Sequence, residues 1–200
     1  MIIIGVTGCI GSGKSTICSI FAKSSIPYYD CDNRAKILIN REEDIIKKMM
    51  SLFGNKVYEN DVFQRDVAAK RMLSNQNILE EFNRILLPYI KDDLEVFKIQ
   101  HTGKDFMCLE SAILMQSDIK LVVNETILVS APMDEKISRI KYRDPFRSDA
   151  EITQLIKSQL TDEDLRKICR YEIINYNKDR IALKQEIENI LLDIKMIYAL

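Results

Sequence analysis

The stretch TGCIGSGKST, residues 7–16, follows the apolar run MIIIGV at the start of the chain. Residues 8–15 match the pattern G-x-x-x-x-G-K-[ST] at every fixed position. Glycines at these positions let the backbone curl, so that successive N–H groups point at one phosphate, and the helix that follows adds its positive end. The pattern predicts a loop that binds a nucleoside triphosphate through Gly8, Gly11, Ser12, Gly13, Lys14, Ser15 and Thr16.

Two side chains of this loop are expected to act on the phosphates. Lys14 should reach the β- and γ-phosphates of the nucleotide, and Ser15 should ligate Mg²⁺ through its hydroxyl. We expect the Lys14 side chain to be exposed in the empty loop. A nucleoside triphosphate and Mg²⁺ are the cofactors that the loop predicts.

The segments around the loop indicate an α/β fold. Residues 2–8 read as a buried parallel strand, and helical spacing follows over residues 14–25. Further strands are expected at 26–30, 106–109 and 124–132, with helices at about 133–143, 149–158, 161–169 and 179–198. Strands that alternate with helices predict a mainly parallel sheet in a P-loop core.

A helix-dense block spans about residues 33–100, between the second and third strands. One helix is expected over 33–52, ended by Phe53-Gly54, and two or three over 65–100, with Pro88 at a helix start or a kink. This block is longer than the usual connection between two strands of a parallel sheet. We therefore expect one domain, 1–200, with a helical insert at about 33–100.

Composition excludes several classes of protein. Hydrophobic residues make up 46% of the chain and charged residues 30%, which is a globular balance. The formal net charge of -1 argues against a general nucleic-acid binder, and no apolar run approaches the roughly 20 residues that cross a bilayer. The five cysteines form no CxxC pair, which favours reduced thiols over disulfides or a zinc site. A cytoplasmic protein is expected.

A switch GTPase is the natural competitor for a phosphate-binding loop. None of the six glycines has an aspartate three positions earlier, so the DxxG loop is absent. Asn177-Lys178-Asp179-Arg180 begins like the guanine-reading N-K-x-D but ends in arginine. A motor ATPase is usually larger. Phosphoryl transfer to a small acceptor fits best, and a non-catalytic nucleotide-binding module stays an alternative.

Acidic residues follow two of the expected strands. Asp30 and Asp32 come after the second strand, where one of them could accept a proton from an acceptor hydroxyl or help to hold Mg²⁺. Helix capping by Asn33 or Asp32 is the alternative role. Glu110 ends another strand, and it is either an acid that supports the metal through water or a surface carboxylate.

Three arginines recur at four-residue steps, at Arg139, Arg143 and Arg147. The spacing puts the first two on one helical face, where they could clamp the transferring phosphoryl group from a closing lid. A solvated helix face is the alternative. We expect the lid at about 140–165.

Taken together, these segments resemble the dephospho-CoA kinase family. The resemblance runs in order from the N-terminus to about Asn175, through TGCIGSGKST, DCD at 30–32, FG at 53–54, Gln64-Arg65, ESAIL at 110–114, SAP at 130–132 and RxxxRD at 139–144. It implies transfer of the γ-phosphate of ATP to the 3′-hydroxyl of dephospho-CoA, the last step of coenzyme A synthesis. It also implies a fold similar to nucleoside monophosphate kinases, with a P-loop core, a helical acceptor side and a lid.

The same resemblance suggests roles for single residues. Asp32 is expected as the general base, Thr7 as its support, Arg139 on the phosphates and Asn175 at the adenine. From the residues alone, Arg65 in the helical block is expected to pair with an acceptor phosphate. Another small-molecule kinase, for a nucleoside, a nucleotide or shikimate, is the alternative within this class. The chain departs from the family pattern at Cys9, Leu87, Leu155 and Arg170.

Overall fold

The computed structural model describes the backbone of residues 1–200 and every side chain except those of Leu73 and Gln116. Contacts divide the chain into two compact units. The first comprises Met1–Tyr29 and His101–Leu200, and the second comprises Asp30–Gln100. We call them the phosphate unit and the helical unit.

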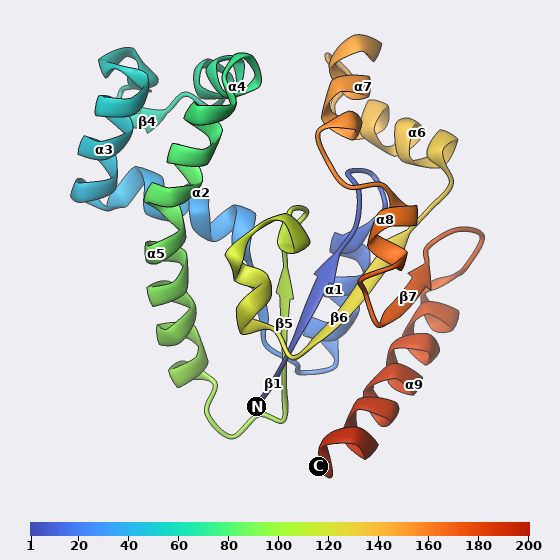
Figure 1. The fold of residues 1–200 in the computed structure, drawn as a ribbon. Helices are drawn as coiled ribbons and strands as arrows, with labels where there is room; N and C mark the ends of the chain where they lie inside the picture. The colour runs from blue at the N-terminus through green and yellow to red at the C-terminus, as the bar shows by residue number, and fades with distance from the viewer. The chain divides into compact units, whose positions relative to one another are not determined.

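A five-stranded sheet forms the centre of the phosphate unit (Figure 1). Strand β1 pairs in parallel with β5 and β6, and β6 pairs in parallel with β7. The strand order is β2-β5-β1-β6-β7, with bounds β1 (Ile2–Thr7), β2 (Tyr28–Asp30), β5 (Phe106–Glu110), β6 (Glu125–Ser130) and β7 (Tyr171–Ile174). The predicted parallel α/β fold is confirmed. Strand β7 was not expected, because four residues are too short for a readable pattern and pairing with β6 defines it.

Two helices cover one face of this sheet, α1 (Lys14–Lys23) and α9 (Arg180–Tyr198). Ile17, Ile20 and Phe21 of α1 are buried there as the spacing predicted. On the other face, the short 3-10 helix η2 (Leu114–Gln116), followed by η3 (Asp118–Val122), lies against β1. This packing fixes the carboxyl end of β1, from which the phosphate loop leaves the sheet.

Three helices follow β6 in the chain and precede β7. They are α6 (Met133–Arg143), α7 (Asp149–Lys157) and α8 (Asp162–Arg166). Ser148 and Glu151 form a capping box that starts α7, and the Thr161 side chain accepts a hydrogen bond from Asp164 N to start α8. A search of the described residues finds no helix with the length and apolar character needed to span a bilayer.

The helical unit packs its helices around an aromatic cluster. The Phe53 ring lies edge-on to Phe63 and Phe82, with centroids 6.1 and 6.0 Å away, and the Tyr58 ring lies 5.4 Å from that of Phe63. The elements are α2 (Cys31–Arg41), α3 (Glu43–Phe53), η1 (Asn55–Val57), β3 (Tyr58–Glu59), β4 (Val62–Phe63), α4 (Arg65–Ser74) and α5 (Gln76–Gln100).

Tertiary contacts correct three expectations for this unit. The helix predicted over 33–52 is two helices, with Glu42 in an extended conformation between them. The Tyr58 hydroxyl donates to Ile39 O at 2.7 Å, at the carbonyl that a continuous helix would use for residue 43. Pro88 lies inside α5 rather than at a helix start. The hairpin of β3 and β4 was not expected, although Asn60-Asp61 supplies the two positive φ angles of its turn.

Candidate active site

The phosphate loop, Gly8–Gly13, joins the end of β1 to the start of α1. Gly11 and Gly13 have φ angles of 82° and 89°, in the left-handed region that favours glycine. A Cβ on Gly11 would lie 2.5 Å from Lys136 O, and one on Gly13 would lie 2.0 Å from Asn175 Nδ2. The loop is therefore both curled and closely covered, and glycine is required at both positions.

Inside the loop, Lys14 folds back onto the main chain. Its Nζ donates to Gly8 O at 2.8 Å and lies 3.5 Å from Cys9 O, and the residue is only 8% exposed. The expectation of an exposed Lys14 is wrong, because the loop carbonyls attract the ammonium group. The hydroxyls of Thr7 and Ser12 are buried and, within the part of the chain described, have no hydrogen-bond partner. An unsatisfied buried hydroxyl is costly, and one at the loop suits a phosphate oxygen as acceptor.

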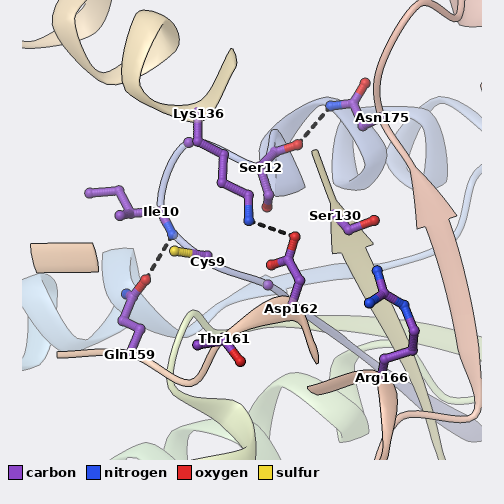
Figure 2. Close-up of polar contacts among 12 residues, drawn as sticks. Cys9, Ile10, Ser12, Ser130, Lys136, Gln159, Thr161, Asp162, Arg166 and Asn175 are labelled. Atoms are coloured by element: carbon purple, nitrogen blue, oxygen red, sulfur yellow. Dashed lines mark hydrogen bonds and ion pairs between the residues drawn. The ribbon is translucent and has the colours of Figure 1, made fainter. Parts of the chain in front are cut away.

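Side chains from three later segments bond to the main chain around the loop, and Figure 2 shows two of them, Gln159 and Asn175. Gln159 Oε1 accepts from Ile10 N at 2.7 Å, and Asn175 Nδ2 donates to Ser12 O at 2.9 Å. Arg139 Nη1 donates to Ser12 O at 3.1 Å, and its Nη2 donates to Asn175 O at 2.9 Å. We call Gln159, Asn175 and Arg139 the outer clamps. They fix main-chain groups of Ile10, Ser12 and Asn175.

The structure separates Arg139 from Arg143 and Arg147. Arg139 contacts the loop, whereas Arg143 donates through Nη2 to Asp144 Oδ2 at 2.9 Å and Arg147 donates through Nε to the same oxygen at 3.3 Å. The hydrogen bond from Arg143 lowers the pKa of Asp144. Arg143 and Arg147 are thus exposed cations held by one carboxylate, at the edge of the segment predicted as a lid.

Candidate ligands for Mg²⁺ lie on the sheet side of the loop. Ser15 is exposed in the first turn of α1, next to Thr16, whose N–H donates to Gly13 O at 3.0 Å. Glu110 at the end of β5 accepts a 2.5 Å hydrogen bond from the Tyr28 hydroxyl. A search of the described residues finds no group of three His, Cys, Asp or Glu side chains that could hold a metal. A cation here would need phosphate or water oxygens as further ligands, as Mg²⁺ usually does in kinases.

The comparison with known protein families agrees with this geometry. The family model described as Dephospho-CoA kinase matches residues 2–180, which include the loop, the outer clamps and the whole helical unit. The chain belongs to the dephospho-CoA kinase family. It is an ATP-dependent phosphotransferase that phosphorylates dephospho-CoA in coenzyme A synthesis.

One relative agrees with this assignment, and two solved structures share the fold. The chain is 34% identical to the dephospho-CoA kinase of Porphyromonas gingivalis, over 84% of this chain and 82% of that protein. Its fold is similar to the crystal structure of dephospho-CoA kinase from Campylobacter jejuni, with a TM-score of 0.66, 20% identity and 96% of both chains covered. A shikimate kinase from Acinetobacter baumannii shares the fold at a TM-score of 0.54 and 14% identity, with 98% of this chain and 95% of that chain covered.

The expected acceptor-side residues of this kinase lie in the helical unit. Asp30 caps α2, since its side chain accepts from Asn33 N at 2.9 Å. Asp32 is exposed in the first turn of the same helix, and Arg65 is exposed as the first residue of α4. The predicted cap, Asn33 or Asp32, is therefore wrong, because the helix starts one residue after Asp30 and Asp30 caps it.

Sequence reasoning missed two residues beside the loop, Lys136 and Asp162. Lys136 Nζ and Asp162 Oδ2 form an ion pair of 2.6 Å, with side-chain exposures of 3% and 17%. A lone lysine and a lone aspartate 26 positions apart give no periodic or spacing signal. Gln159 was not among the predicted site residues either, because its contact with Ile10 spans 149 positions.

Proposed function

We propose that the phosphate unit binds the triphosphate of Mg²⁺-ATP and that the helical unit binds dephospho-CoA. The observation that carries the donor half is the loop itself, with its closely covered glycines, its buried lysine and the unpartnered Ser12 hydroxyl. Lys14 leaves its carbonyl partners to contact the β- and γ-phosphates, and Ser15 holds the cation. In this proposal Asn175 contacts the adenine, and Arg139 and Arg143 leave their present partners to contact the phosphates.

In the proposed reaction the 3′-hydroxyl oxygen of dephospho-CoA attacks the γ-phosphorus. A new O–P bond forms, the bond from the γ-phosphorus to the β–γ bridging oxygen breaks, and ADP leaves. Asp32 takes the hydroxyl proton, with Thr7 as its support. Positioned proton transfer of this kind typically contributes about 10²–10⁴-fold to the rate.

Arg65 supports the acceptor half of the proposal. It is an exposed cation at the start of α4, and arginine pairs well with phosphate groups because its guanidinium donates two parallel hydrogen bonds. Dephospho-CoA offers a pyrophosphate that such a side chain can bind. The lid over about 140–165 and a cytoplasmic location belong to the same proposal.

A parallel acceptor assay tests this function. The purified chain is given Mg²⁺-ATP with dephospho-CoA, shikimate or nucleoside monophosphates, and ADP release and product mass are measured. We expect only dephospho-CoA to stimulate ADP release and to gain one phosphate. Chelation of Mg²⁺ should stop the reaction, and added Mg²⁺ should restore it. Stimulation by another acceptor, or by none, contradicts the proposal.

A further inference from the structure

One peptide unit of the phosphate loop, between Cys9 and Ile10, is held at both ends. The Cys9 carbonyl accepts from Ser12 N at 3.1 Å, and Lys14 Nζ lies 3.5 Å from the same oxygen. The Ile10 N–H on the opposite side of this peptide donates to Gln159 Oε1 at 2.7 Å. The side-chain oxygen of Gln159 is the atom that must face Ile10, because an amide NH₂ cannot accept from an N–H.

Gln159 belongs to the segment that continues α7, and that segment is anchored close by. Lys136 on α6 and Asp162 on α8 form the buried ion pair that joins the two ends of the intervening chain (Figure 2). Removing one partner of a buried pair leaves an unpaired charge, which is strongly unfavourable. The ion pair therefore holds the two ends of this segment together, and we call these ends, Lys136 and residues 156–162, the lid base. Gln159 lies within it, three residues before Asp162.

Beside the close approach of Gly11 to the Lys136 main chain, part of the space between the lid base and the loop is a cavity. The cavity has a volume of about 240 Å³, and its lining includes Cys9 from the loop and Ile156, Leu160 and Lys136 from the lid base. Burial raises the pKa of the Cys9 thiol, although the Lys136 ammonium opposes the shift. Because the Cys9 thiol is neutral and lines an open cavity, it couples the loop only weakly to the lid base. The Gln159–Ile10 hydrogen bond is a direct, short polar link between the lid base and the loop.

We propose that Gln159 is a positioning residue that couples the lid to the phosphate loop through the Ile10 amide. Its side-chain oxygen fixes the orientation of the Cys9–Ile10 peptide, and thereby keeps the Cys9 carbonyl on Ser12 N and near Lys14. Movement of the lid base displaces Gln159 and frees this peptide to rotate. The coupling itself does not depend on the proposed function. Its consequence does: if the loop binds the nucleotide, the lid tunes the affinity of the loop for it.

The test compares Gln159→Met, which keeps side-chain length and removes the acceptor, with Gln159→Glu, which keeps an acceptor oxygen. Gln154→Met is the matched control, because Gln154 is an exposed glutamine of α7 in the same segment. Amide hydrogen exchange at Ile10 is read by NMR in the full chain without ligand. Binding of a non-hydrolysable ATP analogue with Mg²⁺ is measured by calorimetry, and melting temperature is recorded for each variant.

We expect Gln159→Met to speed exchange at Ile10 and to weaken analogue binding about two- to tenfold, the usual effect of one lost hydrogen bond, at an unchanged melting temperature. Gln159→Glu should restore protection of Ile10, and Gln154→Met should change neither quantity. Normal Ile10 protection in Gln159→Met overturns the proposal, and so does an equal effect of Gln154→Met. Neither readout uses dephospho-CoA, so a failure of the acceptor assay leaves this result interpretable.

Discussion

The phosphate loop and the helices of the helical unit are held by polar contacts that span very different distances along the sequence. Around the loop, the outer clamps reach Ile10 and Ser12 across 127 to 163 positions of sequence. In the helical unit, several ion pairs span three or four positions, as in Lys48–Asp44, Arg84–Glu81 and Lys98–Glu95. Arg34–Asp93 is a longer-range exception.

This difference matches what each half of the reaction needs. A phosphate loop must present main-chain N–H groups in a fixed arrangement, and long-range clamps supply that preorganisation before the nucleotide arrives. The proposed acceptor-side residues Asp32 and Arg65 are exposed on first turns of helices, where their backbone is fixed by local structure. The two units should therefore respond differently to substitution.

Asp32→Asn is expected to have the largest effect, because it removes the proposed base from the helical unit. We expect kcat to fall about 10²–10⁴-fold, with little change in melting temperature. Asp30→Asn is the matched control: asparagine caps a helix as well as aspartate does, so kcat should fall much less. Steady-state kinetics with ATP and dephospho-CoA decide between them. A larger loss in Asp30→Asn would reverse the two roles.

Lys14→Ala should reduce kcat about 10²–10³-fold, because a cation is lost where charge develops on the phosphates. Since Lys14 also donates to Gly8 O, we expect the melting temperature to fall slightly as well. Lys23→Ala, at the exposed end of the same helix, serves as the control and should leave both quantities unchanged. Near-normal turnover in Lys14→Ala would refute the donor role of the loop.

Arg65→Ala should weaken binding of the acceptor more than it lowers kcat, and it should leave binding of ATP nearly unchanged. The KM for dephospho-CoA is expected to rise about tenfold, the effect of losing one charge-assisted contact, while the KM for ATP stays nearly constant. Initial rates with each substrate varied in turn give both constants. A rise in the KM for ATP alone would mean that the acceptor binds elsewhere.

Glu172→Gln gives the smallest effect and tests the stability difference between the units. In the phosphate unit, Arg166 donates to both Glu172 oxygens, and Ser130 Oγ donates to Oε1 at 2.6 Å. Arg166, followed by Ser130, holds the pKa of Glu172 below its usual 4.5, so this stabilisation is present above pH 4.5 and is lost as the pH falls further. We expect Glu172→Gln to lower the free energy of unfolding by about 1–2 kcal/mol at pH 7.

The difference from the unsubstituted protein should vanish in acid, as urea unfolding across this pH range will measure. Glu81→Gln, in the exposed i,i+3 pair of the helical unit, should have no measurable effect at neutral pH. Equal destabilisation by the two substitutions would remove the contrast between the units.

The sequence by itself determined the phosphate loop, the strand before it and the helix after it, because each depends on residues close together in the chain. Glycine spacing, an apolar run and three-to-four-residue periodicity are local signals, and they also predicted β5, β6 and most helix bounds. The ordered motifs from TGCIGSGKST to Asn175 were enough to suggest the family that the comparison confirmed.

Only the tertiary structure decided how the loop is held. Nothing in the sequence shows that Lys14 is satisfied by the carbonyl of Gly8, that Gln159 accepts from Ile10, or that Glu42 separates two helices. Each outcome depends on which polar group lies within hydrogen-bond distance of a main-chain atom in the folded state. A buried donor or acceptor must find a partner, and the partner is chosen by proximity in space, which residue spacing does not encode.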